Sequence, residues 1–123
     1  MRRGRAQERD RGVTAIEFAG WLPILLIVAL AALQLGVAGY AALQAGSAAR
    51  AAARLAAQEE TEDAYVAGGL ASLSDALADE ASVERTVACG DEATVTVSVR
   101  VPSVLPFLPN LGTASRTVTM PCD

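Results

Sequence analysis

The stretch RGVTAIEFAGWLPILLIVALAALQLGVAGY, residues 11–40, decides the fold of this chain. From Phe18 to Tyr40 it holds 23 residues without a charge, which as an α-helix extend about 34 Å and suffice to cross a bilayer core of ~30 Å. Pro23 should kink or locally open this helix rather than end it. The stretch therefore predicts a transmembrane helix. A cleaved secretory signal is the competing interpretation, but its apolar region would be shorter and would not continue into Ala-rich helical sequence.

The charges around this run are unevenly distributed. Residues 1–12 contain five arginines and two carboxylates, whereas the residues after Gly12 contain five arginines and twelve carboxylates. Arginines just before a membrane helix stay cytoplasmic, so we expect residues 1–12 to form a disordered, basic cytoplasmic leader. The C-terminal part would then lie outside, in a single-pass protein of the cytoplasmic membrane. The acidic body has no basic patch suited to nucleic acid, and we expect no nucleic-acid binding.

The chain contains no histidine and two cysteines, Cys89 and Cys122. This composition excludes a His-based catalytic triad and a His/Cys zinc site, so we expect no enzymatic activity, no catalytic residue, no metal and no cofactor. Two cysteines that flank a strand-like segment beyond a membrane helix suggest one disulfide in an oxidising compartment. The alternative is two free thiols packed as small hydrophobic side chains.

The sequence after the apolar run predicts helix first and strands later. Residues 41–58 are Ala-rich and should extend the membrane helix as a rod, on which Arg50, Arg54 and Gln58 form a polar stripe that we interpret as a solvated face rather than a partner or lipid contact. An acidic cluster at residues 59–63 should end or bend the rod. Gly68-Gly69 should break the chain before a short amphipathic helix, whose stripe is Leu70, Leu73 and Leu77.

Beyond Ser82 the period changes to that of strands. Alternation begins at Val83, a turn is expected at residues 90–92, and ATVTVSVRV at residues 93–101 places four valines on one face. A last strand is expected at residues 113–120. The predicted fold is thus α+β: a long N-terminal transmembrane helix extended into an Ala-rich rod, then a short helix and a small antiparallel sheet. The expected division is 1–12 leader, 13–58 transmembrane and extended helix, and 59–123 extracytoplasmic α+β domain.

An apolar, Pro-containing loop, PSVLPFLPNLG at residues 102–112, connects the last two strands. Its side chains would either pack over the sheet as part of the core, which we favour slightly, or form an exposed patch that contacts a partner or the membrane.

Within the apolar run, Glu17 is the one charge after Arg11 and before Arg50, and a charge in a membrane segment needs a partner or a task. Thr14 and Glu17 have the spacing of a helix capping box, in which the carboxylate would bond back to the backbone. Ala32, Gly36 and Gly39 lie on one side of the helix and would let another helix approach, although such spacing also arises by chance in Ala-rich helices. Gln34 would form a hydrogen bond across helices or simply be tolerated.

The pattern RGVTAIEFAGWLP at residues 11–23 resembles the TadE-like pseudopilins of the Tad (Flp) pilus system, with an Arg-Gly, a few small residues, Ile-Glu-Phe-Ala and a Pro-interrupted apolar run. The resemblance extends to about residue 57 and is loose beyond. It implies cleavage between Gly12 and Val13 by a membrane prepilin peptidase, and it implies that Glu17, at the fifth mature position, is an assembly determinant.

The function that this resemblance implies is that of a minor pseudopilin, a structural component of Tad-type pilus assembly. The implied partners are the prepilin peptidase, other pilins or pseudopilins and the pilus assembly platform, with incorporation into an extracellular pilus as a further outcome. The competing hypothesis is an unprocessed, single-pass binding module of the cell envelope that recruits a partner through residues 105–108.

Overall fold

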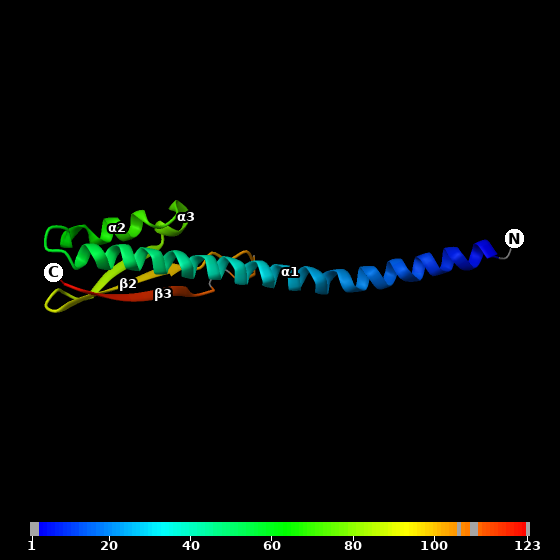
Figure 1. The fold of residues 1–123 in the computed structure, drawn as a ribbon. Helices are drawn as coiled ribbons and strands as arrows, with labels where there is room; N and C mark the ends of the chain where they lie inside the picture. Colours follow the sequence, from blue (N-terminus) through cyan, green and yellow to red (C-terminus); the bar gives the residue numbers. More distant parts are fainter. Residues whose placement is uncertain (1–2, 106, 109–110, 123) are drawn as a thin grey trace. The chain divides into compact units, whose positions relative to one another are not determined.

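A computed structural model describes residues 3–105, 107–108 and 111–122, with side chains from residue 11 onward. The chain forms two compact units, Met1–Leu33 and Gln34–Asp123. The elements in chain order are α1 (Arg3–Ala56), η1 (Glu62–Ala64), α2 (Tyr65–Ala71), α3 (Asp75–Ala78), β1 (Ala81–Val87), β2 (Glu92–Arg100) and β3 (Thr113–Pro121) (Figure 1). The predicted α+β class, with a long apolar helix, short helices and an antiparallel sheet, is confirmed.

The first unit consists of the N-terminal part of α1. The helix begins at Arg3, so the prediction of a disordered leader is wrong for residues 3–12. Arg, Gln, Glu and Ala are good helix formers, and a helix that is already nucleated adds such residues at little cost. The helix also continues through Pro23, as expected for an apolar segment. Within the described residues α1 is the one helix long and apolar enough to cross a membrane.

The second unit contains a three-stranded antiparallel sheet in the order β1-β2-β3. The central strand β2 alternates as the sequence predicted, with Val95, Val97 and Val99 fully buried and the intervening residues half-buried. Val101, just beyond the strand, is buried on the same side. A bulge between Arg85 and Val87 shifts the register of β1, and Val87 is left 51% exposed.

The C-terminal part of α1 supplies the other half of the core. Its buried face consists of alanines, each 5% exposed or less: Ala41, Ala45, Ala48, Ala49, Ala52, Ala53, Ala56 and Ala57. These positions recur at the three- and four-residue spacing of one helix face. Because a methyl group is the whole side chain, the sheet can approach the helix backbone closely. The rod is therefore part of the globular unit, and not only a stalk that carries it.

The glycine pair Gly68-Gly69 does not break the chain, which corrects the sequence prediction. Both residues lie inside α2, which runs beside α1 (Figure 1). A Cβ on Gly69 would lie 3.1 Å from Val83 Cγ2 and 3.2 Å from Ala52 Cβ, so a side chain here would push these neighbours back by a few tenths of an ångström, and glycine permits the close packing of α2 against β1 and α1. The break occurs instead after Ala71, and the expected single leucine helix is divided into α2 and α3.

Candidate functional site

The predicted cleavage site, Gly12-Val13, lies on the exposed surface of α1. A Cβ placed on Gly12 would meet no atom within 4 Å, and Val13 is 56% exposed. No described part of this unit covers the bond, so an external peptidase would reach it once the helix opens locally.

The capping-box prediction for Thr14 and Glu17 is wrong for the uncleaved chain. Because α1 begins at Arg3, Thr14 lies in the helix interior and cannot act as its N-cap. The structure records no hydrogen bond and no ion pair for the Glu17 carboxylate among the residues it describes. A helix cap therefore does not explain why the Glu17 carboxylate is tolerated at this position.

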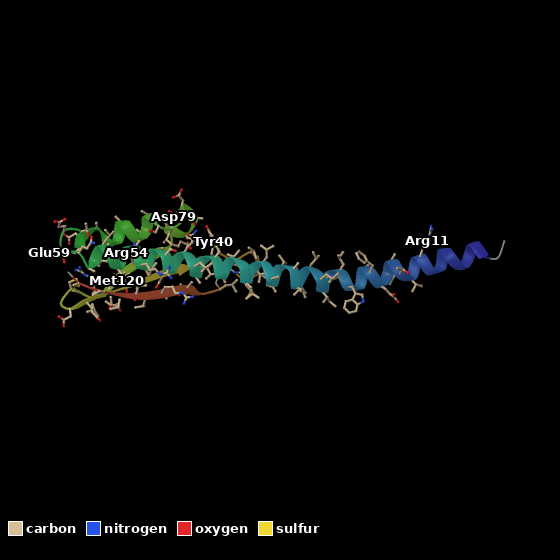
Figure 2. The ribbon with its side chains drawn as sticks, in the orientation of Figure 1. Arg11, Tyr40, Arg54, Glu59, Asp79 and Met120 are labelled. Carbon is tan, nitrogen blue, oxygen red and sulfur yellow. A yellow bond between two sulfur atoms is a disulfide. The ribbon has the colours of Figure 1, made fainter. Side chains whose placement is uncertain are left out.

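The surroundings of Glu17 are apolar and open. Its neighbours Ile16 and Phe18 are 74% and 63% exposed, and Trp21, one turn further on, is 62% exposed. Figure 2 shows the side chains of this part of α1, beyond the labelled Arg11, extending outward from the helix on all sides. A carboxylate on such a surface is costly in lipid unless another molecule supplies a positive partner. Within the described residues of this unit, Glu17 is thus an acid without a recorded partner on a helix whose apolar side chains are exposed.

The small residues predicted to form a packing face are also uncovered. Ala32 is exposed in the first unit, and in the second unit a Cβ on Gly36 or Gly39 would meet no atom within 4 Å. No described segment uses the close approach that these residues permit. They remain available to a helix of another molecule.

Gln34 has a role that the sequence reasoning missed. Its side-chain Nε2 donates to Pro102 O at 3.0 Å, and its Oε1 accepts from Val104 N at 2.8 Å. The amide therefore bonds the backbone of the 102–112 loop in the same way that a neighbouring strand would. Neither hydrophobic period nor spacing indicates such a pair, because its members are about seventy positions apart in the sequence. The feature of the sequence that could have indicated this contact is the polarity of Gln34 inside an otherwise apolar run.

The disulfide between Cys89 and Cys122 is present, which confirms the favoured sequence interpretation. The two Cα atoms are 5.9 Å apart and the cysteines are 33 positions apart in the sequence. The bridge joins the chain just before β2 to the chain just after β3, and Cys122 N donates to Asp91 O at 2.9 Å beside it. It therefore closes the end of the β2-β3 hairpin that lies away from the 102–112 loop.

The polar stripe on the rod is exposed, as predicted for Arg50, Arg54 and Gln58. Figure 2 shows Arg54 and Glu59 near the C-terminal end of α1. Arg50 also lines a groove of about 460 Å³ between α1 and β3, opposite Arg116. Among the described residues no group of His, Cys, Asp or Glu is arranged to hold a metal ion.

The comparison with known families agrees with the motif at the start of α1. Residues 12–54 match the family model described as TadE-like protein. The match begins at the glycine of the predicted cleavage site, includes Glu17 and ends two residues before α1 does. No curated protein and no solved structure was found to match the chain. Over residues 12–54, roughly a third of its length, this chain matches the TadE-like family, and the resemblance carried by its opening motif is confirmed.

Proposed function

We propose that this chain is a minor pseudopilin, a non-catalytic structural component of Tad-type pilus assembly that a prepilin peptidase processes after Gly12. The TadE-like match supports a Tad pilus-related protein. The observation that carries the finer proposal is the Glu17 carboxylate, which has no recorded partner among the described residues and lies five residues after Gly12 on an exposed apolar helix. The leader arginines favour a cytoplasmic N-terminus and an external second unit.

Cleavage changes the chemistry of this helix end in two ways. It removes residues 1–12 with their five arginines, and it converts the Val13 amide nitrogen into a free, positively charged amine. An amine of one subunit can then pair with Glu17 of a neighbour whose helix packs alongside. In a low dielectric, leaving either charge unpaired is costly, so the pair would favour one register of the two helices over others.

The surfaces needed for such packing fit the proposal. The apolar side chains of the first unit are exposed on all sides, and Gly36 and Gly39 leave the helix open to close approach. In lipid, helices associate through small residues of this kind and through interhelical polar contacts. The chain would thus contribute a helix and a register-setting charge, while the peptidase supplies the chemistry.

Intact-mass spectrometry of the membrane-extracted protein tests the processing. In cells with an active prepilin peptidase, we expect a mature chain that begins at Val13, and in cells without the peptidase a chain that retains residues 1–12. A Gly12→Leu variant should stay unprocessed in both. A wild-type chain with an intact leader beside an active peptidase would contradict the proposal and favour an unprocessed membrane-anchored binding module.

A pair of variants separates charge pairing from helix capping in the mature chain. Glu17→Gln keeps the size of the side chain and removes its charge, and Thr14→Ala removes a capping hydroxyl without touching the charge. We expect Glu17→Gln to lower recovery with the other pilus components by at least about tenfold, because an unpaired buried charge costs several kcal/mol, and Thr14→Ala to leave it near wild type. Equal losses in both variants would show that Glu17 acts through the helix end alone.

A further inference from the structure

The loop at residues 102–112, here called the apolar loop, places large hydrophobic side chains on the surface of the second unit. Phe107 is 70% exposed and Leu108 is 44% exposed, whereas Val104 and Leu105 are half-buried. Neither Val104 nor Leu105 is among the side chains packed against the core of the sheet, so the described residues of the loop do not bear out the expectation that it folds over the sheet. The whole loop carries no charge, which is unusual for a projecting connection in water.

Hydrogen bonds within the loop hold the backbone beside the exposed Phe107 and Leu108. The Ser103 hydroxyl lies within hydrogen-bond distance of two carbonyl oxygens, Leu105 O at 3.1 Å and Leu108 O, and its one proton can be donated to either of them. Leu108 N donates to Leu105 O at 3.2 Å. At the base of the loop, Val101 N donates to Gly112 O at 3.1 Å, with Gly112 in the left-handed region at φ 95°. Hydrogen bonds thus join the described residues of the loop, among which Phe107 and Leu108 are exposed.

Gln34 fixes where this loop lies along α1. Its side chain bonds Pro102 O and Val104 N, so the start of the loop is level with Gln34. Twenty helical residues span the hydrocarbon core, and counted from Phe18 they end at Val37, one turn beyond Gln34. On this count, the apolar loop lies at the end of the second unit where α1 would leave a membrane.

The opposite end of the sheet is far from this boundary. β2 runs for nine residues from Glu92 to Arg100, about 30 Å at the rise of a β-strand, and the disulfide and Val87 lie at its beginning. Val87 is 51% exposed, so the two ends of one sheet carry a matched pair of exposed apolar residues. Only the end with Phe107 lies level with Gln34, close to the expected end of the membrane span.

We infer that the apolar loop is a second membrane contact, which inserts Phe107 and Leu108 into the outer boundary between headgroups and acyl chains. Aromatic and apolar side chains are favoured at this depth, and lipid explains why no charge interrupts the loop. The Gln34 amide then serves to pair two backbone groups that would otherwise lose their water at the membrane edge. Loop and helix together set the height and orientation of the second unit on the bilayer. The inference rests on the membrane anchor of the proposed function but not on cleavage or pilus assembly.

Tryptophan fluorescence of the full chain in nanodiscs of phosphatidylcholine tests this inference. Brominated acyl chains quench a tryptophan that contacts them, and Trp21 in the wild type reports whether α1 is inserted. In a Trp21→Phe background, Phe107→Trp should show blue-shifted emission and clear loss of intensity in brominated discs. The matched control, Val87→Trp in the same background, should show solvent-like emission with no bromine effect.

Three outcomes would overturn the inference, and each has a distinct meaning. If Trp21 is quenched but Phe107→Trp is not, and its emission is solvent-like, the helix spans the bilayer and the loop lies in water. If Phe107→Trp is blue-shifted without quenching, a second protein surface covers the loop instead of lipid. If Trp21 itself is not quenched, the membrane anchor fails and the loop contact fails with it. Unchanged circular dichroism and an intact disulfide establish that each variant is folded.

Discussion

Removal of the Cys89–Cys122 disulfide should cost the second unit a large part of its stability. The cysteines are 33 positions apart, and the chain-entropy relation for a loop of this length gives about 3.7 kcal/mol at 25 °C. A unit of this size has a free energy of unfolding of roughly 5 to 13 kcal/mol. The core consists mostly of alanines, with only four valines and two leucines as larger buried side chains, so little apolar area is available to compensate. The second unit of the Cys89→Ser/Cys122→Ser variant should therefore be folded, but with a much lower free energy of unfolding.

Pulse proteolysis of the full chain in detergent micelles along a urea series measures this loss, because it reports the opened second unit and not the helix in the micelle. With a urea m-value of about 1.5 kcal/mol/M, the midpoint should fall by about 2.5 M. Reduction of the wild type should lower the midpoint by the same amount, and the reductant should leave the double-serine variant unchanged. A double-serine variant within about 0.5 kcal/mol of the oxidised wild type would refute the loop-closure reasoning.

Two further changes probe contacts that only the packed structure reveals. Gly69→Val should destabilise the second unit by about 1 to 3 kcal/mol through overpacking against its close neighbours. The control is Ala67→Val at an exposed position of the same helix, which should cost no more than about 0.7 kcal/mol in helix propensity. Equal urea midpoints for the two variants would contradict the close packing of α2. Gln34→Leu removes both hydrogen bonds from the loop backbone, and should destabilise the loop by about 0.5 to 1.5 kcal/mol for each bond, because neither bond is fully buried. Hydrogen exchange should then be faster at the Val104 amide and unchanged at the Val97 amide in β2; unchanged exchange at both would remove the assigned role of Gln34.

Features with a local physical cause were predictable from the sequence. An uncharged run from Phe18 to Tyr40 has few states available other than a helix in an apolar surrounding. The strict alternation from Ala93 to Val101 buries one face of a strand whatever its neighbours are. Even the disulfide follows, since the two cysteines bracket a single antiparallel hairpin whose ends must meet.

Other features depended on which surfaces meet, and periodicity carries no information about that. The alanine face of α1 is compatible with solvent, with lipid or with a core, and only contact with the valines of β2 makes it a core. Gly68-Gly69 has the composition of a break but lies in a helix, because Val83 and Ala52 leave no room for larger side chains at Gly69.

The candidate site divides in the same way. The sequence by itself determined the motif from Gly12 to Glu17 and the apolar run that follows it, because charge, apolar length and spacing are properties of the local chain. The helix that begins at Arg3 and removes the cap at Thr14 also has a local cause, the helix propensity of residues 3–12, which the prediction of a disordered leader did not weigh. Only the tertiary structure decided that Gln34 bonds the apolar loop. The physical reason is that hydrogen bonds and close packing between distant segments depend on positions in space, which a one-dimensional pattern does not contain.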